Sequence, residues 1–145
     1  MTIYNPKWQQ YFLSIANAVA QNSKCRSRKI GAVLVRDKSV IATGYNGPAR
    51  DITSCWECAR PEGGPLNVCP AAHAEVNCIA NAARMGVCTA DSTMFVTCEI
   101  PCKDCLSTLI NAGIKLVYVT ELKFYDTLAS YILDHEVIRA ILIKE

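Results

Sequence analysis

The sequence predicts an α/β sandwich with a partly parallel sheet. In some segments apolar residues recur at helical spacing, whereas other segments are short runs rich in β-branched and aromatic residues. In the second half of the chain these two kinds of segment alternate, an order that favours helices packed on a sheet with parallel strands. A chain of 145 residues can bury its own core, so we expect one domain spanning residues 1–145.

The first part of the chain is expected to form one helix and two strands. The helix is predicted over residues 6–22, where large apolar residues recur at helical spacing, Asn5 can cap the first turn and Pro6 suits the first helical position. Strands are predicted over residues 30–36 and 40–45, on either side of a short turn.

A long loop is predicted over residues 46–71. It is rich in proline, shows little periodicity and holds three of the nine cysteines. A loop of about 25 residues in a compact domain is functional, held by a metal or disordered.

Helices and strands alternate through the rest of the chain. A helix rich in alanine is stopped by Gly86, and a later helix begins just after Pro101. Helices are expected over residues 72–85, 102–111 and 124–133, and strands over residues 93–98, 116–120 and 137–143. A helix is the alternative for the last of these segments.

Composition and charge exclude several classes of protein. A content of 51% hydrophobic and 19% charged residues excludes intrinsic disorder, and fifteen basic against thirteen acidic residues is too balanced for a strong nucleic-acid or membrane field. No apolar run approaches the roughly 20 residues that span a bilayer, and the N-terminus lacks the pattern of a secretory signal. We therefore expect a cytoplasmic protein, in which cysteines are metal ligands, catalytic thiols or packing residues rather than disulfides.

Two short motifs at predicted helix starts carry the chemistry. One places Glu75 two residues after His73, and the other, PCKDC, places Cys102 and Cys105 three residues apart on one helical face. Helix N-termini stabilise negative charge and so favour the thiolate form that binds metal. One imidazole and two thiolates give zinc three protein ligands and leave the fourth position for water, as in catalytic sites.

Glu75 is suited to carry protons at such a site. A carboxylate two residues from a ligand can take a proton from metal-activated water and pass it to a leaving amine. H-x-E paired with P-C-x-x-C is the signature of zinc nucleobase deaminases. Each motif alone is weak evidence, but together they predict a catalytic zinc site.

The remaining histidine and the isolated cysteines have simpler interpretations. His135 lies near a predicted turn and is expected to be a surface residue. Cys78, Cys88 and Cys98 lie among apolar or small residues, so we interpret them as packing residues.

From residue 25 to residue 118 the sequence resembles the deoxycytidylate (dCMP) deaminase branch of the cytidine deaminase superfamily. The matching segments are SKCRSRKIGAVLVRD, IATGYNGPA, HAEVNCIANAAR, MFVTCEIPCKDC and LINAGIKLVYV. The resemblance implies a three-layer α-β-α sandwich on a five-stranded mixed sheet. It also implies hydrolytic conversion of dCMP to dUMP with release of ammonia, which supplies dUMP for thymidylate synthesis. A homo-oligomer, a hexamer or a dimer, is implied as well, in the host cytosol if a phage encodes the chain.

Roles for individual residues follow from the same resemblance. The histidine and the two cysteines of the motifs would bind the catalytic zinc, and Glu75 would shuttle protons. Asn46 would contact the deoxyribose or the pyrimidine, the backbone of Ala74 would help to hold the base, and Tyr125 is a candidate to stack on the ring. The 5′-phosphate needs cationic or N–H partners. The nearest basic cluster consists of Arg26, Arg28 and Lys29, for which a solvated turn is the alternative.

Some family members carry a second, structural zinc. Its ligands include cysteines at the positions of Cys25 and Cys55, and here Cys58 and Cys69 lie nearby in sequence to complete a closed four-cysteine site. Such a site would order the long loop. The resemblance thus predicts about two zinc ions per chain.

Many family members are activated by dCTP and inhibited by dTTP, with Mg²⁺ accompanying the regulatory nucleotide. Arg84 matches a position tied to this regulation and to subunit contacts. Asn81 stands where such members often have a bulky apolar residue. A salt bridge at a helix C-terminus is the alternative for Arg84.

Other functions stay open from the sequence. These are deamination of another cytosine nucleotide or nucleoside, including modified dCMP, deamination of adenosine in tRNA, and a structural zinc-binding module. The near-neutral charge favours a small nucleotide over a nucleic-acid polymer. Glu75 argues against the structural module, because a closed metal site has no use for a proton carrier.

Overall fold

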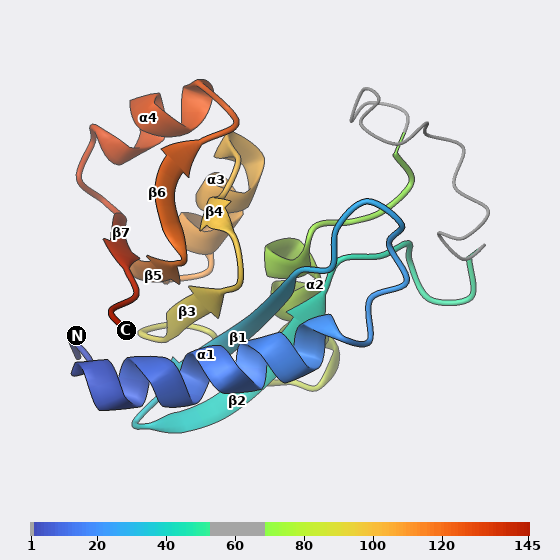
Figure 1. Cartoon of the computed structure of the whole chain (residues 1–145), viewed down its shortest axis with the longest axis horizontal. Coiled ribbons are helices and arrows are strands. Elements are labelled where there is room, and N and C mark those ends of the chain that lie inside the picture. Colours follow the sequence, from blue (N-terminus) through green and yellow to red (C-terminus); the bar gives the residue numbers. More distant parts are fainter. Residues whose placement is uncertain (1, 53–68) are drawn as a thin grey trace.

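The computed structural model describes residues 2–52 and 69–145, and these residues form three layers (Figure 1). The helices are α1 (Pro6–Ala20), α2 (Ala74–Arg84), α3 (Lys103–Asn111) and α4 (Leu128–Leu133). The strands are β1 (Gly31–Arg36), β2 (Ser39–Tyr45), β3 (Thr93–Val96), β4 (Glu99–Ile100), β5 (Leu116–Val119), β6 (Glu121–Phe124) and β7 (Arg139–Leu142).

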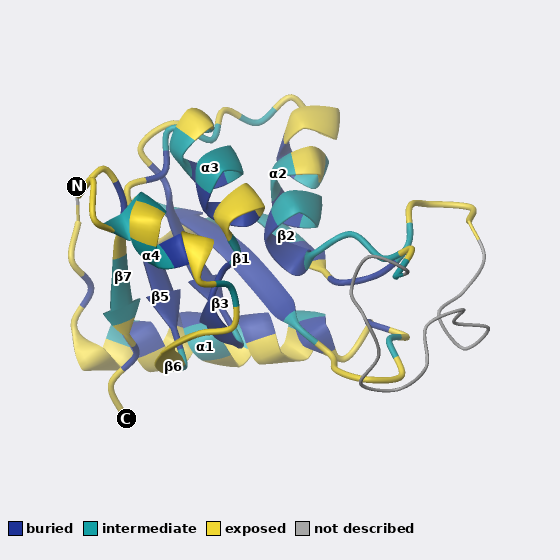
Figure 2. Ribbon diagram, turned by 90° about the horizontal axis from the view of Figure 1, so that it is seen from above, coloured by how far each residue is buried: buried dark blue, intermediate teal, exposed yellow. Residues whose placement is uncertain are grey.

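The main sheet has five strands in the order β2-β1-β3-β5-β7. Strand β1 runs antiparallel to β2 and β3, whereas β3, β5 and β7 are parallel. Helix α1 covers one face of the sheet, and α2 and α3 lie side by side on the other (Figure 2). The predicted three-layer α-β-α sandwich with a five-stranded mixed sheet is confirmed.

The side-chain alternation of β1 divides the core between the two faces of the sheet. Ala32 and Leu34 pack into the cluster beneath α2 and α3, whereas Val33 and Val35 pack into the cluster beneath α1. All four are fully or almost fully buried. Because α2 and α3 pack on the same face, their N-termini reach the same end of the sheet, where the reactive groups of α/β folds gather.

A close approach between α2 and β2 depends on Gly44. A Cβ atom at this position would lie 2.3 Å from the backbone nitrogen of Cys78 and 2.7 Å from the carbonyl oxygen of Ala74. Any larger residue would therefore push α2 away from the sheet. The missing side chain thus sets where the first turn of α2 lies.

Most predicted elements are present with ends shifted by a few residues, but one prediction was wrong and two strands were not predicted. Residues 124–133 were expected to form one helix, whereas β6 extends to Phe124 and α4 begins only at Leu128. The sequence also did not predict β4, which pairs in parallel with β6 in a separate two-stranded sheet. A strand of two residues is too short to show periodicity, and all four residues of β6 are exposed, so neither carries an alternating pattern.

The last segment forms the strand β7, so its helix alternative was wrong. Most of the predicted loop over residues 46–71 lies outside the described residues. Within the described ranges, no helix has the length and apolar character needed to cross a membrane.

Candidate active site

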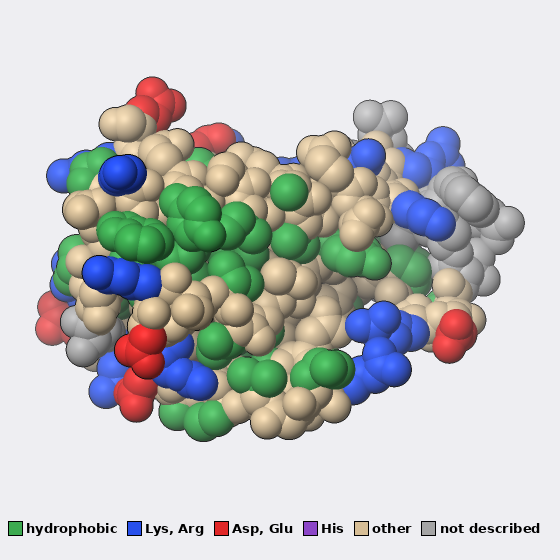
Figure 3. All heavy atoms as spheres, turned by 90° about the horizontal axis from the view of Figure 1, so that it is seen from below, with side chains coloured by type: hydrophobic (Ala, Val, Ile, Leu, Met, Phe, Trp, Pro, Cys, Tyr) green, Lys and Arg blue, Asp and Glu red, His purple; other side chains and the backbone are tan. Residues whose placement is uncertain are grey.

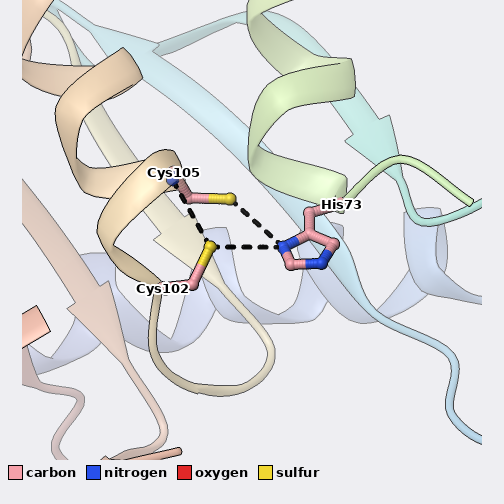
Figure 4. A group of neighbouring side chains, drawn as sticks. All are labelled: His73, Cys102 and Cys105. Atoms are coloured by element: carbon pink, nitrogen blue, oxygen red, sulfur yellow. Dashed lines mark hydrogen bonds between the residues drawn. The ribbon is translucent and has the colours of Figure 1, made fainter. Parts of the chain in front are cut away.

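Three potential metal ligands converge where α2 and α3 begin (Figure 4). The Nδ1 atom of His73 lies 3.6 Å from Sγ of Cys102 and 3.3 Å from Sγ of Cys105. The three ligand atoms all lie within 4.8 Å of one another. The structure thus brings together the ligands that the two sequence motifs predicted.

These residues fit a zinc ion in both chemistry and spacing. With Zn–S of about 2.3 Å and Zn–N of about 2.0 Å, tetrahedral geometry places nitrogen and sulfur ligands about 3.5 Å apart. The two nitrogen–sulfur separations observed are close to that value. Three protein ligands leave one tetrahedral position for a water or substrate atom.

The start of α3 favours a thiolate at Cys102. This residue is the N-cap of α3, and its Sγ accepts a hydrogen bond from the backbone N–H of Cys105 at 3.4 Å. Hydrogen bonds from the Cys105 thiol and from His73 lower the pKa of Cys102 to about 4. The hydrogen bond to Cys102 and burial raise the pKa of Cys105. A bound cation favours loss of the proton from both thiols.

Glu75 is a buried carboxyl next to the ligands. It lies in the first turn of α2, and only 3% of it is exposed. Burial raises the pKa of Glu75, while a hydrogen bond from its own backbone N–H and the positive charge of His73 oppose that rise. A carboxyl whose pKa is moved upward toward neutrality suits general acid–base catalysis.

A cleft of about 500 Å³ opens beside these groups. Several predicted site residues line it, as does one acidic residue that the sequence did not single out. The lining includes Arg28, Asn46, His73, Ala74, Glu75, Tyr125 and the unpredicted Glu99. Four of the six predicted substrate contacts thus lie around one cavity with the metal ligand His73 and with Glu75.

Asn46 holds the neighbouring backbone with its side chain. Its Oδ1 accepts a hydrogen bond from the N–H of Ile30 at 2.9 Å, and its Nδ2 donates to the carbonyl oxygen of Arg28 at 2.8 Å. An asparagine amide can donate twice and accept twice. One donor and one acceptor position therefore remain for a ligand in the cleft.

Within the predicted basic cluster, the structure distinguishes Arg28. Its guanidinium makes two hydrogen bonds to the Glu99 carboxylate, at 2.6 and 2.7 Å, and its side chain lines the cleft. Arg26 and Lys29 are exposed and are not among the residues lining this cleft. Figure 3 shows Lys and Arg side chains gathered at the end of the molecule where this segment lies.

The other cysteines fall into three groups. Cys78 and Cys98 are buried, as predicted for packing residues, but Cys88 is exposed and that prediction was wrong. Cys88 lies between α2 and β3, where small neighbours mark a surface connection rather than a core. Cys25 and Cys69 both line the cleft, whereas Cys55 and Cys58 lie outside the described residues. His135 is exposed, as predicted.

Arg84 lies in the last turn of α2, away from the cleft. It lines a second hollow, of about 400 Å³, together with Arg50 and Asn81. Arg50 donates a hydrogen bond to Oδ1 of Asn81 at 2.9 Å, and Nδ2 of Asn81 donates to the carbonyl oxygen of Thr43. Within residues 2–52 and 69–145 Arg84 makes no salt bridge.

Comparison with curated proteins identifies relatives over most of the chain. The chain is 38% identical to the deoxycytidylate deaminase of Mycobacterium phage D29, over 80% of this chain and 97% of that protein. It is 34% identical to the deoxycytidylate deaminase of Saccharomyces cerevisiae, over 92% of this chain and 41% of that protein. The chain therefore spans about two-fifths of the yeast protein but almost all of the phage protein.

Solved structures agree with these relatives. The dCMP deaminase of cyanophage S-TIM5, solved in complex with dCMP and dUMP, matches with a TM-score of 0.80 and 27% identity, over 95% of this chain and 98% of that one. The family model for the cytidine and deoxycytidylate deaminase zinc-binding region matches residues 6–121, which include the three converging ligands and Glu75. The chain therefore belongs to the cytidine and deoxycytidylate deaminase family.

Proposed function

We propose that this chain is a single deaminase domain, residues 1–145, that converts dCMP to dUMP and releases ammonia. This activity would supply dUMP for thymidylate synthesis in the cytoplasm, which is the host cytosol if a phage encodes the chain. The observation that carries the proposal is the buried Glu75 carboxyl beside three metal ligands, at the edge of a cleft large enough for a nucleotide. The choice of dCMP as the substrate is supported by relatives that are named deoxycytidylate deaminases.

His73, Cys102 and Cys105 are the residues that would hold zinc in this reaction. When bound, zinc supplies an acidic water that serves as the nucleophile near neutral pH. Glu75 would accept the first proton of the attacking water and deliver it to N3 of cytosine, and would then accept the second from the new hydroxyl at C4 and deliver it to the departing amino group. One water is consumed for each dCMP, and one dUMP and one ammonia are formed.

Substrate contacts are assigned to residues that line the same cleft as His73. Asn46 offers one free donor and one free acceptor to the sugar or the base, and the backbone of Ala74 holds the ring. Tyr125 stacks on the pyrimidine from the end of β6. Arg28 meets the 5′-phosphate, and Arg26 and Lys29 add positive charge nearby.

The test is an ammonia-release assay over dCMP, CMP, deoxycytidine, dCTP and 5-methyl-dCMP. We expect dCMP to give the highest kcat/KM, with dUMP as the product identified by mass. Adenosine in a tRNA anticodon stem-loop serves as the contrasting substrate. Failure with every phosphorylated cytosine compound would overturn the substrate assignment.

A second zinc site is proposed from Cys25 and Cys69 with Cys55 and Cys58. Its support is that Cys25 and Cys69 lie on the wall of one cleft although they are 44 positions apart in the sequence. Elemental analysis of the purified chain should give about two zinc ions per chain. The Cys69→Ser variant should give about one while keeping deaminase activity measurable, and a wild-type value near one would contradict the second site.

Regulation by dCTP and dTTP, with Mg²⁺ as the counter-ion of the triphosphate, is proposed at the hollow next to Arg84. Its support is two arginines, Arg84 and Arg50, on one hollow outside the active site. The assembly is proposed to be a hexamer or a dimer. Activity measured with each triphosphate tests the regulation, and light scattering tests the oligomeric state. An Arg84→Ala variant that responds to dCTP and dTTP as the wild type does would exclude this site.

A further inference from the structure

An ion pair in the cleft wall joins two residues that are 71 positions apart. Arg28 Nη1 lies 2.6 Å from Glu99 Oε1, and Arg28 Nη2 lies 2.7 Å from Glu99 Oε2. Glu99 is 4% exposed as a residue, whereas the Arg28 side chain is 47% exposed. The carboxylate is therefore fixed in the protein, and the guanidinium is held between it and the open cleft.

Arg28 has no regular secondary structure to hold it. It lies in the segment between α1 and β1, where Asn46 binds the main chain on both sides of Lys29. Asn46 thus fixes the backbone of Arg28, and Glu99 fixes the far end of its side chain. A long, flexible side chain held at both ends loses little further freedom when it binds a ligand.

The ion pair leaves Arg28 able to recognise an anion. A guanidinium has five N–H donors, and the bidentate bond to Glu99 uses two of them. Three donors therefore remain on a side chain that is half exposed in the cleft. Because the charge of Glu99 offsets that of Arg28, the benefit of the pair for an anionic ligand lies in the fixed direction of these donors rather than in net charge.

Glu99 also connects this arrangement to the metal ligands. It lies in β4, three residues before Cys102, and β4 pairs with β6, which ends next to Tyr125. A single short segment therefore carries both the carboxylate that holds Arg28 and the first thiol ligand. This fixes the spacing between the group that meets the phosphate and the groups that act on the base.

We propose that Glu99 is a positioning residue that orients Arg28 toward the 5′-phosphate, so that the pair selects nucleotides over nucleosides. The inference rests on the proposed function, because it concerns the same substrate. It goes further in assigning a task to an acidic residue. It also predicts a direction for the change in phosphate affinity that is opposite to the one expected from net charge alone. Removing the negative charge of Glu99 would strengthen phosphate binding if net charge governed affinity, but it weakens binding if orientation does.

The experiment compares Glu99→Gln with wild type on dCMP and on deoxycytidine. We expect KM for dCMP to rise about tenfold with kcat changed less than twofold, and kcat/KM for deoxycytidine to be unchanged. Calorimetric binding of dUMP and deoxyuridine provides a second readout that does not need turnover, and only dUMP should bind more weakly. Glu121→Gln is the matched control, since Glu121 is the exposed register partner of Glu99 on β6 and the variant loses the same charge.

A double-mutant cycle completes the test. In an Arg28→Ala background, Glu99→Gln should change KM for dCMP less than twofold, because the residue to be oriented is absent. Equal losses for dCMP and deoxycytidine would show a purely structural role and overturn the inference, as would tighter dUMP binding by Glu99→Gln. If the wild type bound dUMP normally but did not deaminate dCMP, the proposed function would be overturned. The calorimetric comparison of dUMP with deoxyuridine would still test the role of Glu99. If Glu99→Gln does not fold, Arg28→Lys, which keeps the charge but loses the bidentate geometry, should show the same split between dCMP and deoxycytidine.

Discussion

Sγ of Cys105 lies 3.3 Å from Nδ1 of His73, although His73 caps the start of α2 and Cys105 lies in α3, 32 positions away. Cys102 lies one turn from Cys105 on α3, so the thiol pair forms locally and the imidazole must be brought to it. The packing of α2 against the sheet therefore decides whether the third ligand is in place.

Loss of either thiol should remove the metal. We expect Cys102→Ser and Cys105→Ser to lose the catalytic zinc, and wild-type protein substituted with Co²⁺ to show thiolate-to-cobalt charge-transfer absorption that both variants lack. Chelation should lower the Tm of the wild type, because binding free energy contributes to folding free energy. Cys88→Ser, at an exposed cysteine, is the control and should keep both metal content and absorption.

Replacing Glu75 should separate chemistry from binding. Glu75→Gln keeps the shape of the side chain but cannot accept a proton, so kcat should fall about 10²–10⁴-fold. Metal content and the binding of dUMP should stay close to wild type. A variant that retained more than a tenth of the wild-type kcat would contradict the assigned proton transfer.

Gly44 should be sensitive to the smallest possible substitution. In Gly44→Ala the new methyl group would meet three backbone atoms of α2, so we expect a loss of about 1–3 kcal/mol in the free energy of unfolding. Because displacement of reacting groups by about 1 Å costs on the order of 10²-fold in rate, kcat should fall as well. Gly47→Ala is the matched control, since a Cβ there would meet nothing within 4 Å, and it should change neither quantity.

The ion pair between Arg28 and Glu99 predicts a pH-dependent stability. The hydrogen-bonded guanidinium of Arg28 lowers the pKa of Glu99. A carboxyl whose folded pKa is depressed adds stability above its unfolded pKa, near 4.3, and loses that contribution as the pH falls through the folded value. Since half of the Arg28 side chain is exposed, the contribution at pH 7 is only about 1 kcal/mol.

Urea denaturation of wild type and Glu99→Gln at a series of pH values checks this expectation. The difference in unfolding free energy should be present at pH 7 and should shrink steadily below about pH 4. A difference that grew toward acid pH would show that Glu99 is not paired as described.

The parts of the site that local spacing encodes were predictable from the sequence. Cys102 and Cys105 lie one helical turn apart, and Glu75 follows His73 by two residues, so each pair carries its geometry with it. The alternation of helices and strands along the chain was also predictable, because each helix and each buried strand shows its own period of apolar residues.

Contacts that join distant segments were not predictable in this way. Glu99 meets Arg28 across 71 positions, and neither residue belongs to a periodic element long enough to indicate a partner. The ribbon of β4 and β6 was missed because its strands are short or wholly exposed. Cys88 was misjudged because small neighbours occur both in tightly packed cores and in surface connections.

The placement of the metal ligands has a consequence for the order in which the protein matures. His73 belongs to the connection between β2 and β3, whereas the two thiols belong to the connection between β3 and β5. Neither connection holds three ligands, so the complete set does not exist until both have docked on the assembled sheet. We therefore expect the complete zinc site to form late in folding, unlike in a zinc finger, whose folding depends on the metal from the start because its ligands are close in sequence.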